Sequence, residues 1–181
     1  MKVFKKATHA AAGLMVCGAM ALSLSSCLDD TENNYDDWRK QNDKFVSEIN
    51  TSEYTRVVPD WAPGNSVYIK WHNDRSLTAD SLVPMSTSTV DIKYELENIE
   101  GLKLGNSYAA ATGDSVYQSM PNENIVGMWI AMTTMHVGDS ATLIIPYPSA
   151  YGANVTSGIK PYSTLIYHMK LKAIRAYERP L

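Results

Sequence analysis

Three segments of this 181-residue chain alternate apolar and polar residues with a period of two. In the clearest of them, residues 90–97, Val, Ile, Tyr and Leu alternate with Asp, Lys and Glu, and residues 67–72 and 165–173 show the same alternation. Such alternation gives a strand one buried and one wetter face, as an antiparallel sheet allows. The pattern therefore predicts an antiparallel sheet covered on one side, to which residues 140–146 add a further strand.

Two other segments carry apolar residues at helical spacing. One predicts a short helix that ends near the turn at 136–138, with the apolar positions Ile125, Met128, Trp129, Met132 and Met135. The other predicts an amphipathic helix from Asp36 to Ile49, with the apolar positions Tyr35, Trp38, Phe45, Val46 and Ile49. Because a helix of this length is marginal alone, we expect its apolar stripe to pack on the domain. A partner-binding helix is the alternative.

The N-terminus has the parts of a secretory signal: three lysines in the first six residues, an uncharged stretch at 10–24, and small residues before Cys27. The apolar stretch is shorter than the roughly 20 residues that span a bilayer. The run 24–27 resembles a bacterial lipobox, whose cysteine is lipidated and becomes the mature N-terminus. It implies a lipoprotein of the bacterial cell envelope, carrying palmitate-type lipid on Cys27, and we expect the outer membrane. The alternative is an ordinary signal peptide followed by an incidental cysteine.

The charge balance limits the classes of partner that the chain is expected to bind. The chain has a formal net charge of −3, and the signal removes three lysines and no acid, which leaves 13 basic and 19 acidic residues. This argues against nucleic acid or an anionic membrane surface as a partner, so the lipid is the one membrane attachment expected. Acidic residues at 28–32 resemble a surface-export signal of some Gram-negative lineages. With Cys17 removed and Cys27 lipidated, stability must come from a packed core rather than a disulfide.

Together these elements predict an α+β fold, in which a twisted antiparallel sheet wraps around one short helix and an amphipathic helix precedes the sheet. The length suits one domain behind a tether. The expected divisions are a signal peptide at 1–26, a lipid-anchored tether at 27–35, an N-terminal helix and linker at 36–65, and the main domain at 66–181.

From Val90 onward the chain resembles the FKBP-type peptidyl-prolyl isomerases, which implies the FK506-binding fold for the main domain. The matching stretches, in the family's order, are Val90–Tyr94, Glu100–Gly101, Glu123–Gly127, Met135–Gly138, Leu143–Pro146, Ala150–Ala153 and Ile159–Tyr167. No stretch is specific alone, so the order and spacing carry the resemblance. Residues 66–89 are expected to supply the family's first strand and its crossing loop.

The resemblance implies rotation about Xaa-Pro peptide bonds, with proline-containing polypeptides as partners and a monomeric protein. The uncatalysed barrier is about 18–20 kcal/mol because the planar amide is resonance-stabilised. An apolar pocket that favours the twisted amide over the planar one lowers this barrier without a nucleophile, metal or general base. The four histidines lack metal-ligand spacing, so no metal or cofactor is expected.

By resemblance, four residues are assigned to catalysis, namely Tyr94, Ile125, Tyr151 and Tyr167. Tyr94 would line the pocket, and Tyr167 would contact the prolyl ring. The backbone N–H of Ile125 and the hydroxyl of Tyr151 would each donate to a substrate carbonyl. Ile159 would form an apolar wall. Plain core packing is the alternative for each position.

The expected substrate pocket departs from the family pattern in several places. The family's Phe-Asp pair is Leu104–Gly105 here, which removes an aromatic wall and a carboxylate. Met128 stands where the family has a tryptophan at the floor of the pocket. Trp129 comes one residue later, which on a helix is a rotation of about 100°. The lid at 152–159 is short, and the aromatic expected near Val116–Tyr117 aligns two ways. Since about 1.4 kcal/mol is tenfold in rate, these changes imply activity lower by roughly tens- to a thousand-fold.

Three functions therefore stay open. The first is an envelope peptidyl-prolyl isomerase that helps exported proteins to fold. The second is a non-catalytic FKBP-like module that binds a proline-containing segment or a partner protein. The third is a structural lipoprotein of an outer-membrane assembly, which would dock through Trp38 and Phe45 of the N-terminal helix.

Overall fold

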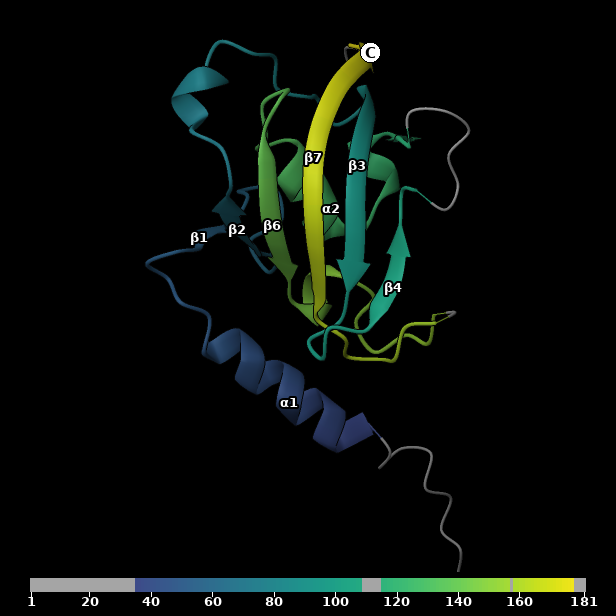
Figure 1. Cartoon of the computed structure of the whole chain (residues 1–181). Helices are drawn as coiled ribbons and strands as arrows, with labels where there is room; N and C mark the ends of the chain where they lie inside the picture. Colours follow the sequence, from purple (N-terminus) through teal and green to yellow (C-terminus); the bar gives the residue numbers. More distant parts are fainter. Residues whose placement is uncertain (1–34, 109–114, 157, 178–181) are drawn as a thin grey trace, which may run out of the picture. The chain divides into compact units, whose positions relative to one another are not determined.

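The structure is a computed structural model that describes residues 35–108, 115–156 and 158–177 (Figure 1). The chain divides into two compact units, 1–30 and 31–181, and every described residue belongs to the second unit. The predicted signal peptide, Cys27 and the tether up to residue 34 lie outside the described residues. Among the helices in the described ranges, none combines the length and the apolar character that a membrane crossing needs.

A seven-stranded sheet forms the domain, in the order β1-β2-β6-β7-β3-β4, and β5 also pairs with β3. The strands are β1 Thr55–Val57, β2 Val67–Trp71, β3 Thr89–Glu97, β4 Lys103–Asn106, β5 Tyr117–Ser119, β6 Ser140–Ile145 and β7 Leu165–Ala176. All the pairings are antiparallel, and β4 and β5 flank different halves of β3. The antiparallel sheet predicted from alternating residues is therefore confirmed.

Strand β7 shows how the alternation produces the two faces of the sheet. Its odd-numbered residues 165–171 are buried, whereas His168, Lys170 and Lys172 are exposed. The buried face packs with helix α2 (Val126–Met132), which lies against one side of the sheet (Figure 1). The opposite side bears the exposed residues of β7.

Helix α2 is shorter than the predicted 125–135 segment. Ile125 is its N-cap residue, and the hydroxyls of Thr133 and Thr134 donate to the carbonyl oxygens of Trp129 and Ile130, at 2.9 and 2.7 Å. Threonine hydroxyls compete in this way with continued helical bonding, which explains the early end. Gly127 permits the close packing of α2 on β6, because a Cβ there would lie 2.2 Å from Cγ2 of Ile145.

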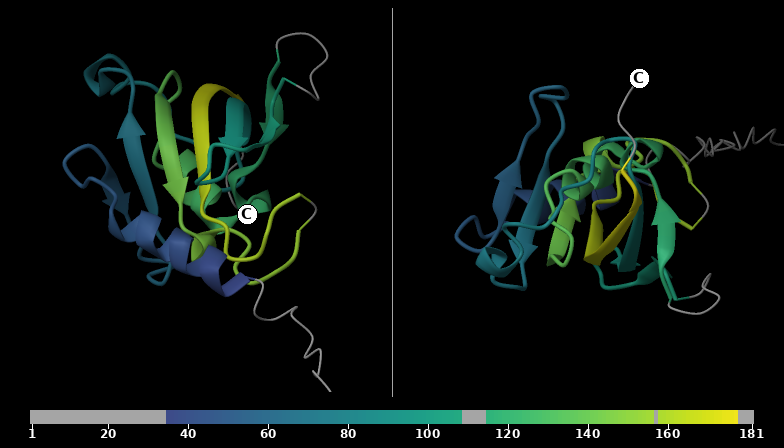
Figure 2. Two further views of the ribbon diagram at one scale, coloured as in Figure 1. Left: turned by 60° about the horizontal axis from the view of Figure 1, so that its bottom comes forward. Right: turned by 90° about the horizontal axis from the view of Figure 1, so that it is seen from above.

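The N-terminal helix α1 spans Asp36–Ser47, so the prediction of a helix is confirmed although it ends two residues early. It packs on the domain, as expected, but its buried residues are Trp38 and Asn42. The indole N–H of Trp38 donates to Oγ of Ser163 at 3.1 Å, and Oδ1 of Asn42 accepts from the N–H of Thr164 at 2.7 Å. Figure 2 shows α1 beside the segment that leads into β7. Trp38 is thus engaged within the chain and is not presented to a partner.

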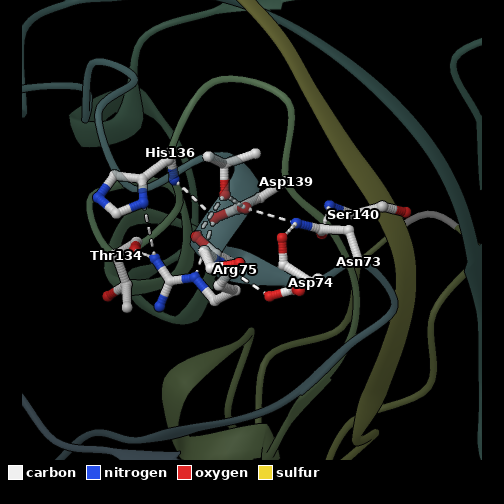
Figure 3. A network of polar contacts seen from close by, with 9 residues as sticks. Asn73, Asp74, Arg75, Thr134, His136, Asp139 and Ser140 are labelled. Atoms are coloured by element: carbon white, nitrogen blue, oxygen red, sulfur yellow. Dashed lines mark hydrogen bonds and ion pairs between the residues drawn. The ribbon is translucent and has the colours of Figure 1, made fainter.

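A partly buried polar cluster, centred on the buried Asp139, joins the loop after β2 to the turn before β6 (Figure 3). We call Asn73, Arg75, Thr78, His136 and Asp139 the Asp139 cluster. The carboxylate of Asp139, which is fully buried, accepts from Oγ1 of Thr78 at 2.6 Å, Nδ2 of Asn73 at 3.0 Å and the N–H of His136 at 2.8 Å. Nε of Arg75 lies 3.3 Å from the same carboxylate, and Nη2 donates to Nδ1 of His136 at 3.1 Å.

Candidate functional site

Tyrosines from two central strands meet on the α2 side of the sheet, at the edge of the core. The ring centroids of Tyr94 on β3 and Tyr167 on β7 are 5.6 Å apart. Tyr117 on β5 packs its ring edge-on against Tyr94, at 5.9 Å. Tyr151, in the loop after the short helix η4 (Tyr147–Ser149), is near enough to perturb the ionisation of Tyr94 and Tyr167. These four residues are called the tyrosine cluster, and three of them are the predicted catalytic tyrosines.

The surroundings of Tyr94 and Tyr167 raise the pKa of both hydroxyls. Burial raises the pKa of Tyr167, and Tyr151, Tyr94 and Tyr117 raise it further. Burial also raises the pKa of Tyr94, with additional contributions from Tyr117 and Tyr151. A raised tyrosine pKa means that the neutral hydroxyl, which can donate a hydrogen bond, persists well above neutral pH.

The hydroxyls of Tyr94, Tyr151 and Tyr167 make no hydrogen bond to any described residue. Within the described ranges, two fully buried side-chain atoms lack a hydrogen-bond partner, namely Nε of Arg75 and Oγ1 of Thr164. None of the three tyrosine hydroxyls is among these buried atoms. The three hydroxyls are therefore reachable from outside the core. Groups of this kind are available to a ligand, because no internal acceptor has to be displaced.

A backbone donor lies at the start of α2. Ile125 has φ −55° and ψ 149°, and its carbonyl accepts from the N–H of Trp129 at 3.0 Å. Its own N–H has no acceptor among the described residues, as expected at a helix N-terminus without a side-chain cap. The Ile125 side chain packs against the core. The structure thus places an open N–H at the position predicted to bind a substrate carbonyl.

The residues predicted to form the floor and walls of the substrate pocket differ in how deeply they are buried. Met128 is buried at 2% exposure in α2, and Ile159 and Leu104 are partly buried against the same core. Trp129 does not replace a floor tryptophan, since its ring stacks on Trp61 with the centroids 4.3 Å apart. Consecutive residues of a helix are rotated by about 100° about its axis, so Met128 and Trp129 lie on different faces of α2.

Gly105 is a position with open space near the tyrosine cluster. It pairs with Leu96 across β3 and β4, and opposite residues of an antiparallel pair share one face of the sheet. A Cβ built on Gly105 would meet no heavy atom within 4 Å. The missing carboxylate therefore leaves open space on the core side, diagonal to Tyr94.

Sequence reasoning left the aromatic near 116–117 in two alignments, and the structure gives Tyr117 the contact with Tyr94. It missed the Asp139 cluster, for which the spacing of residues along the chain gives no signal. No group of three His, Cys, Asp or Glu side chains among the described residues is arranged to hold a metal ion.

Known proteins resemble this chain in sequence pattern and in fold. Residues 82–172 match a family model described as FKBP-type peptidyl-prolyl cis-trans isomerase. The matched segment contains every member of the tyrosine cluster and Ile125. A search of curated protein sequences found no match.

Solved structures share the fold. A peptidyl-prolyl cis-trans isomerase from Pseudomonas syringae pv. tomato is similar with a TM-score of 0.62 and 18% identity, over 77% of this chain and 95% of that one. FkpA from Escherichia coli is similar with a TM-score of 0.60 and 21% identity, over 82% of this chain and 62% of FkpA. These similarities confirm the predicted FKBP-like α+β fold.

Proposed function

Because this chain belongs to the FKBP-type peptidyl-prolyl cis-trans isomerase family, we propose that it isomerises Xaa-Pro bonds of exported polypeptides in the bacterial cell envelope. The observation that carries the proposal is the pair of open donors, the Tyr151 hydroxyl and the Ile125 N–H, beside an apolar core. The two donors come from different loops, so a peptide bound between them would be held at two points.

The mechanism follows from the electronic structure of the amide. Twisting the Xaa-Pro bond breaks resonance, so the transition state is less polar at nitrogen than the planar ground state. An apolar floor such as Met128 favours the twisted form, while the two donors hold carbonyl oxygens and fix the chain on either side. Only interactions that are stronger in the twisted state accelerate the reaction.

The same geometry supports reduced activity. Gly105 offers no carboxylate, and the Tyr94 hydroxyl has no acceptor among the described residues. For this reason a non-catalytic module that binds proline-containing segments is the second candidate. The docking of a structural lipoprotein through Trp38 has less support, since that side chain is 6% exposed.

A protease-coupled isomerisation assay on a chromogenic Xaa-Pro tetrapeptide tests the activity. We expect the purified protein to exceed the buffer rate, and Tyr151→Phe to lower kcat/KM roughly threefold to tenfold, the worth of one neutral hydrogen bond. The matched control is Tyr177→Phe, an exposed tyrosine at the end of β7, which should leave the rate unchanged. If the wild type equals buffer while Leu104→Phe with Gly105→Asp turns over, the binding module is the correct function.

We further propose that the protein is tethered by lipid on Cys27, as the lipobox-like run 24–27 suggests. Labelling cells with an alkyne analogue of palmitate tests this, and Cys27→Ala should abolish both the label and recovery in the outer-membrane fraction. Retention of both by Cys27→Ala would contradict the anchor. Protease shaving of intact cells then separates a surface-exposed protein, which is cut, from a periplasmic one.

A further inference from the structure

Helix α1 is bonded to the segment at 160–164, which leads directly into β7 (Figure 2). The indole N–H of Trp38 donates to Oγ of Ser163, and Oδ1 of Asn42 accepts from the N–H of Thr164. Trp38 is 6% exposed and Asn42 is fully buried, so both bonds are shielded from water. Breaking either of them would leave a buried polar group without a partner, which is costly. The segment is therefore held in place by α1 as well as by the sheet.

Arg39 of α1 reaches the chain on both sides of Tyr151. Its guanidinium carbon lies 5.1 Å from the centroid of the Tyr162 ring and 5.9 Å from the centroid of the Tyr147 ring. The two rings pack edge to face, with their centroids 5.5 Å apart. Both guanidinium distances fall within the roughly 6 Å over which a cation is attracted to the face of an aromatic ring. A single side chain of α1 thus joins a tyrosine that precedes Tyr151 to one that follows it.

The same two tyrosines hold the backbone beside Tyr151. The N–H of Gly152 donates to the carbonyl oxygen of Tyr147 at 2.9 Å, and the N–H of Tyr162 donates to the carbonyl oxygen of Gly152 at 2.8 Å. Gly152 follows Tyr151 directly and has a φ of 62°, which glycine adopts without strain. Because both of its backbone bonds go to residues that Arg39 contacts, the position of α1 is linked to the position of Tyr151.

Tyr162 adopts a backbone conformation that needs support from its neighbours. Its φ is 59°, in the left-handed region that is unfavourable for a bulky side chain. A strained residue of this kind persists only where the surrounding structure over-determines it, and such residues cluster at functional sites. Arg39 contacts its ring, Gly152 accepts from its N–H, and α1 bonds the next two residues, Ser163 and Thr164. Removal of a contact from α1 should therefore loosen the bond between Tyr162 and Gly152.

We propose that α1 is a positioning element of the isomerase site, and that Arg39 sets the place of the Tyr151 hydroxyl. The inference rests on the proposed function, because it concerns the donor that holds a substrate carbonyl there. Arg39 acts through the two tyrosines beside Tyr151 and is a positioning residue rather than a catalytic one. A hydrogen bond weakens steeply as its angle departs from linear, so a small displacement of the hydroxyl lowers turnover.

A double-mutant cycle on the turnover of the purified protein tests the proposal. Arg39→Gln should lower kcat/KM roughly twofold to fivefold, the contribution of one exposed cation–π contact. In the Tyr151→Phe background the same substitution should change the rate by less than about 1.5-fold, because no hydroxyl is left to position. Lys40→Gln is the matched control, since Lys40 is the next residue of α1 and pairs with Asp37 within the helix. It should leave the rate unchanged.

The NMR signal of Cζ of Tyr151, in protein with labelled tyrosine, gives a second readout that does not need turnover. Its loss in Tyr151→Phe identifies it. Arg39→Gln should shift or broaden this signal, and Lys40→Gln should leave it in place. If the wild type is no faster than buffer, the isomerase function fails, and the NMR comparison alone decides whether α1 positions Tyr151.

The proposal is overturned if Arg39→Gln lowers the rate equally with and without the Tyr151 hydroxyl. It is also overturned if the Tyr151 signal does not respond to Arg39→Gln, or if Lys40→Gln moves it as far. Unchanged urea midpoints of the variants show that unfolding is not the cause of any difference.

Discussion

Two regions of the domain set polar atoms against the apolar core, and they treat those atoms in opposite ways. In the Asp139 cluster, a fully buried carboxylate accepts three hydrogen bonds and lies beside a guanidinium. In the tyrosine cluster, three hydroxyls have no partner among the described residues, and the same holds for the N–H of Ile125 at the start of α2. The polar groups of the first region bond one another, whereas those of the second stay available to water or a ligand.

The contrast separates groups that stabilise the fold from groups that are free to bind. A buried polar group without a partner costs free energy, so a cluster in which nearly all groups are paired fixes one conformation of its loops. Open donors at an accessible edge keep contact with water and can exchange it for a substrate carbonyl. Substitutions in the two regions should therefore alter different quantities, namely stability in the first and turnover in the second.

The largest effect is expected for Asp139→Asn. The amide removes the charge that faces Arg75 and presents a donor to groups that already donate, so we expect a loss of about 3 kcal/mol in the free energy of unfolding. Urea denaturation at constant m-value measures it. Activity per folded molecule should stay within twofold, because the cluster and the tyrosines lie in different parts of the domain.

Asp80→Asn is the control for this substitution, since Asp80 is exposed and lies in the same loop region. It should leave stability unchanged within about 0.5 kcal/mol. A normal unfolding midpoint for Asp139→Asn would break the comparison, because the pairing in the cluster would then contribute nothing.

Ile125→Pro should show the next largest effect, on turnover. The φ of −55° at Ile125 suits proline, and Asn124 has the extended φ of −105° and ψ of 172° that a residue before proline prefers. The substitution removes the open N–H, and no internal hydrogen bond among the described residues is lost. Compared with Ile125→Ala, which keeps the N–H and also shortens the side chain, we expect about a further tenfold fall in kcat/KM. Equal rates for the two variants would exclude the N–H from substrate binding.

Gly105→Asp should raise turnover by a smaller factor, roughly threefold to tenfold, if the missing carboxylate is worth one hydrogen bond in the transition state. Space is available, because a Cβ there meets nothing within 4 Å. The new carboxylate would be diagonal to Tyr94, whose hydroxyl has no acceptor among the described residues. Gly105→Asn is the matched control of the same shape. An equal gain from asparagine would show that filling the space matters and the charge does not.

The sequence could predict the sheet because alternation is a local property of each strand. Strands β3 and β7 lie where residues 90–97 and 165–173 alternate. The end of α2 was misjudged because the hydroxyls of Thr133 and Thr134 compete for its carbonyls, which an apolar pattern does not register. Asn42 was missed for a similar reason. A polar residue in a helix normally faces water, but this one bonds the backbone of Thr164.

The candidate site could be assigned to positions only through the resemblance to a family. Nothing in the periodicity of β3 or β7 distinguishes Tyr94 and Tyr167 from core residues, since both lie on the apolar face. The Asp139 cluster had no local signal at all, because Asn73 and Asp139 are 66 residues apart and meet only after β2 pairs with β6. Tertiary pairing of this kind becomes visible once the register of the strands is known.

The smallest effect is the acid dependence of stability, and it follows from the same carboxylate. Burial raises the pKa of Asp139, but hydrogen bonds from Thr78, the His136 N–H and Asn73, with the charge of Arg75, outweigh burial and hold the pKa below its usual range. A carboxyl with a lowered folded-state pKa contributes stability that is fully present above its unfolded pKa and is lost as the pH falls through the folded pKa. Below the unfolded value of 3.8, wild type should therefore lose stability faster than Asp139→Asn, by at most about 1.4 kcal/mol per pH unit, because one proton is involved. Urea midpoints measured from pH 6 to pH 2.5 would give the two slopes. Parallel curves would mean that the ionised carboxylate of Asp139 contributes no stability to the fold.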